Sequence, residues 1–132
     1  MAGGKLDAAG TAKLKTLDEG LLLLQRLHGL VEQYALAVKN GQPTSALMMN
    51  LRRQFPTLAE NLKAQFQTIS DLVTATVLAS TRGGSESVRV RNLREGVAQI
   101  RQSMDIAVTQ TRVRHTVNEV PERASGSGGD AS

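Results

Sequence analysis

The sequence predicts an all-α protein, an up-and-down bundle of three long helices plus one short helix, packed as a three- or four-helix bundle. Apolar residues recur at alternating spacings of three and four along most of residues 12–118, as on the buried face of a helix. No stretch alternates apolar and polar residues as a half-buried strand does. Turn-forming residues cluster at 40–43 and 81–87, so the connections should be short and neighbouring helices antiparallel.

The first helix is predicted from about Leu14 to Lys39, where Asn40-Gly41 supplies a stop. Its main line of positions at this spacing is Leu14, Leu17, Leu21, Leu24, His28, Val31, Ala35 and Val38. A second line beside it is Leu23, Leu27, Leu30 and Tyr34. Two adjoining lines make a stripe too wide for a two-stranded coiled coil, so we expect at least two other helices to flank this one.

The second helix is predicted to be short, from Thr44 or Ser45 to Phe55. Two interpretations remain open at Pro56, a true break and a kink in one longer helix. We favour the break, because Thr57-Leu-Ala-Glu60 has the form of a capping box that would start a new helix. The third helix would then run from Thr57 to about Ser80.

The last helix is predicted from about Glu86 to His115, after a loop at residues 81–87 in which Ser85 or Ser87 serves as the N-cap. Gly96 lies just beside its apolar line and is a candidate for close packing against a neighbour. The long helices of about 24 to 30 residues would each span about 36 to 45 Å at the α-helical rise.

Length and composition indicate one bundle domain at residues 12–118, between a disordered N-terminal tail at 1–11 and a disordered C-terminal tail at 119–132. The chain has no cysteine, which excludes disulfides and thiolate metal sites. No apolar run approaches the roughly 20 residues of a membrane span, and no signal peptide is recognisable. We expect a soluble intracellular protein, cytoplasmic or nuclear.

Candidate chemistry is scarce. The two histidines are His28 and His115, and only Glu32 could join His28 as a ligand at helical spacing. No nucleophile with a base and no phosphate-binding glycine loop is present. We therefore expect a protein that is not an enzyme, without catalytic, metal-binding or cofactor-binding residues and without a cofactor. His28 is interpreted as a structural polar group on the apolar seam, with control of the packing register as a weaker idea.

The charge pattern is the most unequal feature of the chain, whose formal net charge is +4. All basic residues between 82 and 114 are arginines, seven of them against three acidic residues. Arginine forks bind carboxylates and phosphates in two-point geometry, so an arginine face suits an acidic protein or a nucleic-acid backbone. An ordinary solvated face is the alternative. The candidates are Arg91, Arg94 and Arg101, of which Arg94 and Arg101 share a side of the helix.

A second candidate surface is the segment around the adjacent methionines Met48 and Met49, followed by Arg52 and Arg53. Methionine adapts to partner surfaces, although filling the core is the alternative role for this pair. The expected function is that of a protein-interaction module, an adaptor or small subunit of a larger complex. It would bind a helical or acidic protein through an apolar groove and the arginine face. The alternative is nonspecific nucleic-acid binding through phosphates, and a homo-oligomer remains open.

Overall fold

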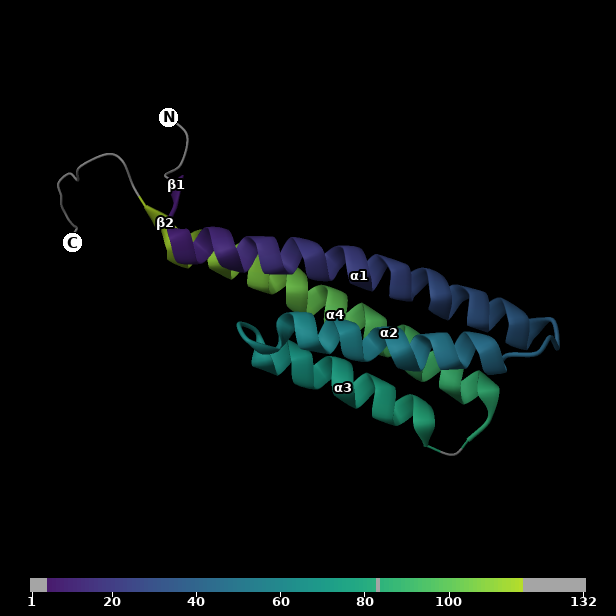
Figure 1. The fold of residues 1–132 in the computed structure, drawn as a ribbon. Helices are drawn as coiled ribbons and strands as arrows, with labels where there is room; N and C mark the ends of the chain where they lie inside the picture. Colours follow the sequence, from purple (N-terminus) through teal and green to yellow (C-terminus); the bar gives the residue numbers. More distant parts are fainter. Residues whose placement is uncertain (1–4, 83, 118–132) are drawn as a thin grey trace.

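The computed structural model describes residues 5–82 and 84–117 of the chain. Its helices are α1 (Ala8–Lys39), α2 (Ser45–Lys63), α3 (Gln67–Thr81) and α4 (Glu86–His115). Each helix packs against the next, and α4 packs back against α1, so that the four helices surround one core (Figure 1). The predicted helical bundle is therefore confirmed. No helix within the described ranges is both long and apolar enough to cross a membrane.

The helices differ in length, and this difference shapes one end of the bundle. Helices α1 and α4 have 32 and 30 residues, whereas α2 and α3 have 19 and 15. The short helix is therefore α3 and not the segment that ends at Phe55. At one end, α1 and α4 extend beyond the α2–α3 turn (Figure 1). There β1 (Lys5–Leu6) pairs antiparallel with β2 (Thr116–Val117) as a two-residue ladder.

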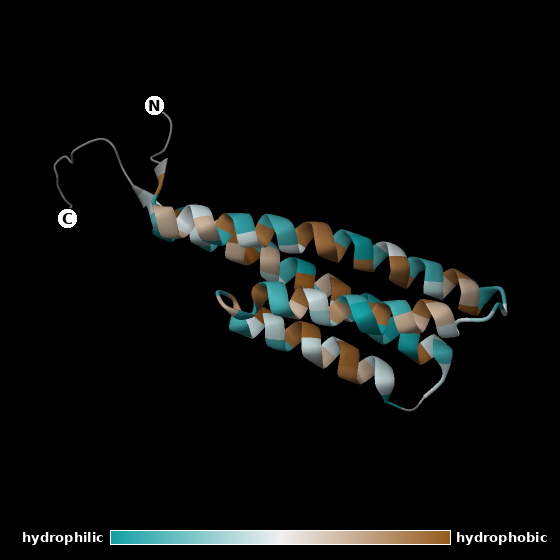
Figure 2. Cartoon of the chain, in the orientation of Figure 1, coloured by the Kyte–Doolittle hydropathy of each residue, from teal (hydrophilic) through white to brown (hydrophobic). Residues whose placement is uncertain are grey.

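The core is one cluster of apolar side chains contributed by all four helices. Figure 2 shows apolar and polar residues alternating around the helices, as expected where one face is buried. The buried members are Leu17, Leu24, Leu27, Val31, Tyr34, Met48, Leu51, Phe55, Leu58, Leu62, Ile69, Val73, Val90, Leu93, Val97, Ile100, Met104 and Ala107.

The buried line of α1 runs between the two predicted lines and includes Gly20. A Cβ at Gly20 would lie 2.7 Å from the Met104 methyl carbon, so the glycine lets α4 approach closely. This shift explains why the placement of His28 on the apolar seam was wrong. The His28 side chain is 61% exposed and lies on the flank of the helix.

Several helix ends lie where the sequence predicts them. Helix α1 ends at Lys39, and Gly41 has a φ of 65°, in the left-handed region that favours glycine. Helix α4 has the predicted bounds, and the Ser85 Oγ accepts a hydrogen bond from the Val88 amide at 3.2 Å. Gly96 is buried against α3, where an added Cβ would overlap the Thr76 side chain. The predicted close-packing point is therefore confirmed.

The N-terminal end of α1 differs from the prediction. The helix begins at Ala8, because the Asp7 carboxylate caps it by accepting a hydrogen bond from the Gly10 amide at 2.6 Å. Residues 8–11 thus belong to the helix and not to the expected tail. Residues 1–4 of the expected N-terminal tail lie outside the described residues. The whole expected C-terminal tail, residues 119–132, lies outside them as well, together with residue 118.

The predicted break at Pro56 is wrong. Pro56 lies inside α2, exposed to solvent, while Phe55 and Leu58 on either side are fully buried. The Thr57 hydroxyl does not cap a helix but donates to the Arg53 carbonyl oxygen one turn earlier. The chain instead breaks at 64–66, where the Phe66 amide donates to the Leu62 carbonyl oxygen at 2.7 Å. Burial of the apolar face on both sides of Pro56 outweighs the cost of the proline.

Replacing Pro56 with alanine should raise the free energy of unfolding by about 1–3 kcal/mol, because alanine restores an amide inside a continuous helix. Chemical denaturation followed by circular dichroism measures the change. Ala59→Pro, one turn further along the same helix, is the opposite control and should destabilise. A loss of stability in Pro56→Ala would contradict a continuous α2, since a proline at the start of a helix is favourable.

Candidate functional site

Two hollows lie end to end along the seam between α1 and α4. Their volumes are about 640 and 370 Å³, and Glu32 and Arg94 line both of them. Together they form one groove, called here the α1–α4 groove. It is lined by Leu24, Gln25, His28, Glu32, Ala35, Leu36, Val38 and Lys39 of α1 and by Ser87, Val90, Arg94, Val97, Ala98 and Arg101 of α4.

An ion pair crosses the groove where the two hollows meet. The Arg94 Nε donates to Glu32 Oε2 at 2.9 Å, and a terminal guanidinium nitrogen donates to Oε1 at 2.7 Å. The hydrogen bonds from Arg94 lower the pKa of Glu32, and Glu32 raises the pKa of Arg94. Both side chains are about half exposed, so the pair adds little to stability. Its effect is to hold the guanidinium across the groove.

The groove as a whole combines apolar surface with positive charge. The basic side chains that line it are Lys39, Arg94 and Arg101, against the single carboxylate of Glu32. Leu36 is 57% exposed at its edge, beside Ala35 and Val38. A shallower hollow continues from Arg101 to Ile106 over the outer face of α4. The groove is therefore an open apolar channel with a net positive rim.

The predicted partner-binding residues do not all meet at one place. Arg94 and Arg101 lie together in the groove, as expected from their shared side of the helix. Arg91 is exposed on α4 but does not line the groove. Arg52 and Arg53 are exposed on α2. The methionine pair is divided, since Met48 belongs to the core and Met49 is 61% exposed. Met48 therefore has the alternative role, that of filling the core.

His28 lines the groove beside Glu32. Its Nε2 atom lies 3.9 Å from Glu32 Oε2, one turn along α1. Within residues 5–82 and 84–117, no three His, Asp or Glu side chains gather closely enough to hold a metal ion. The nearest strong donor to Glu32 is Arg94 and not His28.

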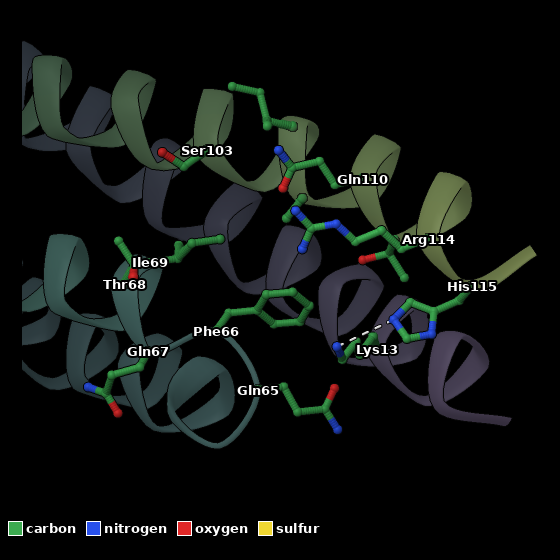
Figure 3. A pocket seen from close by; sticks show the side chains of 13 residues that line it. Lys13, Gln65, Phe66, Gln67, Thr68, Ile69, Ser103, Gln110, Arg114 and His115 are labelled. Carbon is green, nitrogen blue, oxygen red and sulfur yellow. Dashed lines mark hydrogen bonds between the residues drawn. The ribbon is translucent and has the colours of Figure 1, made fainter. Parts of the chain in front are cut away.

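A separate pocket, called here the end pocket, lies where the α2–α3 turn meets the extended ends of α1 and α4 (Figure 3). Its volume is about 320 Å³. Figure 3 shows Lys13, Arg114 and His115 entering it from the end that carries the β ladder. It is lined by Lys13, Gln65, Phe66, Gln67, Thr68, Ile69, Ser103, Ile106, Ala107, Gln110, Thr111, Arg114 and His115. It shares no lining residue with the α1–α4 groove.

His115 lies between two charged groups, those of Asp7, which caps α1, and Lys13 of α1. Its Nδ1 atom lies 3.2 and 3.3 Å from the two Asp7 carboxylate oxygens, and its Nε2 atom lies 3.4 Å from the Lys13 Nζ. The Asp7 amide also donates to the His115 carbonyl oxygen at 2.8 Å. The sequence did not predict this cluster, because His115 is more than 100 positions from both Asp7 and Lys13.

The Asp7 cluster should make this end of the bundle sensitive to acid. The pKa of Asp7 is lowered first by the hydrogen bond from the Gly10 amide and also by His115 and Lys13. A carboxyl pKa that is lower in the folded state contributes stability above the unfolded-state pKa, and this is lost as the pH falls through the folded value. In Asp7→Asn, the loss of stability below about pH 4 should therefore be shallower than in the wild type.

Urea denaturation at a series of pH values measures this effect. Asp18→Asn, which removes an exposed carboxylate from the same helix, is the matched control. An equal change in the acid dependence of both variants would contradict the role assigned to the cluster.

Comparisons with protein-family models, with curated proteins and with solved structures find no match to this chain. The fold places the chain in the class of four-helix bundles. A function can therefore be inferred only from the chain's own residues.

Proposed function

We propose that this chain is a non-enzymatic protein-interaction module, an adaptor or small subunit of a complex, which binds an acidic amphipathic helix of another protein in the α1–α4 groove. The observation that carries the proposal is the joining of Arg94 and Arg101 to exposed apolar surface in one channel between two helices. Helix-in-groove recognition uses this combination, with apolar anchors in the channel and charges at its rim.

Charge complementarity selects the occupant. Three basic side chains and one carboxylate line the groove, and the carboxylate is already satisfied by Arg94. Arg101 lies 3.7 Å from Asp105 in an exposed pair with 63% of its side chain accessible, so it can turn to an incoming carboxylate at little cost. An acidic helix is attracted to this rim, and a basic helix is repelled.

The test compares two substitutions that each reverse the charge of one arginine and therefore change the net charge of the protein equally. Arg101→Glu alters the groove, whereas Arg52→Glu alters the exposed face of α2. Affinity capture from the native cell should recover the same partner with the wild type and with Arg52→Glu, and Arg101→Glu should lose it by about tenfold or more. The segment of the partner that crosslinks to the bait should be an acidic amphipathic helix. An equal loss in both variants, or no loss in Arg101→Glu, would contradict the groove as the binding site.

The alternative function is nonspecific nucleic-acid binding through the arginines. Arg91, Arg52 and Arg53 are exposed and would support it, but they lie outside the α1–α4 groove, where basic side chains and apolar surface meet. Phosphate binding weakens steeply as salt rises, whereas an apolar groove contact responds little. Titration of a short duplex at low and moderate salt tests this alternative. Tight binding that is equally weakened by Arg101→Glu and Arg52→Glu would favour nucleic acid over the protein partner.

A further inference from the structure

We infer that the end pocket is a binding site for a small organic oxyanion, a carboxylate or phosphate ester with a compact apolar body. The inference does not depend on the proposed function of the groove, since the two sites have no lining residue in common. Three features of the pocket carry it: its charge, its apolar wall and its size.

The charge of the lining favours an anion. Lys13, Arg114 and His115 line one end of the pocket, and none of the described residues that line it carries a carboxylate. Figure 3 shows the Arg114 side chain reaching back over the pocket and the Lys13 ammonium beside the His115 ring. The only carboxylate of this cluster, Asp7, lies on the Nδ1 side of His115, where it also caps α1. An oxyanion at this end can accept from the guanidinium fork and from the ammonium.

The opposite wall of the pocket is suited to an apolar body. Phe66, Ile69, Ile106 and Ala107 lie there, and Ile106 is 50% exposed. The first-turn residues of α3 also line the pocket, and the N-cap residue Phe66 makes no side-chain capping hydrogen bond. The backbone amides of that turn add a partial positive charge.

The size of the pocket sets the class of ligand. A volume of about 320 Å³ is at the lower end of the range for small-molecule sites, about 300–1,000 Å³. It admits a ring or short chain with one anionic head. Gln110 and Thr111, one turn before Arg114 and His115, add neutral hydrogen-bonding groups near the head, whereas Ser103 lies at the far end of the pocket (Figure 3).

The test titrates the full chain with benzoate, with benzyl alcohol as the neutral probe of the same shape and with inorganic phosphate as the head group alone. Amide resonances in NMR spectra report the site. Benzoate should shift those of Thr68, Ile69 and Thr111 with a Kd of about 1–10 mM, and both other probes should bind at least about tenfold more weakly.

Two matched pairs of variants complete the test. Arg114→Gln and Lys13→Gln should each weaken benzoate binding by about tenfold, because each removes a donor to the anion. Arg112→Gln and Lys15→Gln remove exposed basic groups one turn or less away that do not line the pocket, and should leave binding within about twofold. Circular dichroism confirms folding of each variant. Equal binding of benzyl alcohol, no saturable shift, or equal effects within the pairs would each overturn the inference.

Discussion

Replacing Phe55 with alanine should lower the free energy of unfolding by about 3–5 kcal/mol, a large part of the stability of a domain of this size. The Phe55 side chain is 1% exposed and lies in the central cluster, contributed by α2 at the residue before Pro56. Truncation removes the buried area of the ring and leaves a cavity that the surrounding leucines can fill only in part. The effect should be visible as a lower midpoint of denaturation in guanidinium chloride.

Phe66→Ala provides the comparison for Phe55. Phe66 is only half-buried at the α2–α3 turn, so its truncation should cost markedly less. A loss of under about 1 kcal/mol in Phe55→Ala, or one no larger than in Phe66→Ala, would contradict the position of Phe55 in the central cluster.

The second large effect is the difference between two glycine-to-alanine substitutions, which should change the free energy of unfolding in opposite directions. Gly29→Ala should stabilise by about 0.5–1 kcal/mol, because Gly29 is exposed in the middle of α1 and an added Cβ meets nothing within 4 Å. Gly96→Ala should destabilise by about 1–3 kcal/mol, because its Cβ would overlap the β-branched Thr76 side chain of α3. Thermal and chemical denaturation of the two variants under the same conditions measures the difference.

A double-mutant cycle identifies the cause of the Gly96 effect. Truncation of Thr76 to alanine removes the hydroxyl and methyl groups that the new Cβ would meet. Gly96→Ala should therefore cost less in the Thr76→Ala background than in the wild type, by about 1 kcal/mol. Strictly additive losses would show that the contact between α3 and α4 at Gly96 is looser than the structure has it.

Local signals explain which parts of the fold could be predicted from the sequence. The last helix was predicted at both ends, because Ser85 is a strong N-cap and the three-and-four spacing persists to His115. The end of the first helix followed from Asn40-Gly41. Pro56 misled the prediction, because the local cost of an internal proline, about 3 kcal/mol, is offset by tertiary burial on both sides. The real break at 64–66 contains neither glycine nor proline.

The error at Pro56 also explains why the end pocket was not foreseen. A helix from Thr57 to Ser80 would have run nearly the full length of the bundle, whereas the break at 64–66 leaves both α2 and α3 shorter than α1 and α4. That shortening leaves the ends of α1 and α4 uncovered and brings Lys13, Phe66 and Arg114 together. For the groove, helical spacing was sufficient to place Arg94 and Arg101 on one side. It could not show that Glu32 of α1 would face Arg94.

Photo-crosslinking in the native cell tests the groove as the partner's binding site most directly. A benzophenone amino acid is placed at Ala98, an exposed residue of α4 in the groove, or at Ala75, an exposed residue of α3 away from it. We expect one strong adduct from Ala98, mapped to an acidic amphipathic helix of another protein, and no such adduct from Ala75. Equal adducts from both positions, an adduct from Ala75 alone, or only self-adducts from Ala98 would contradict it.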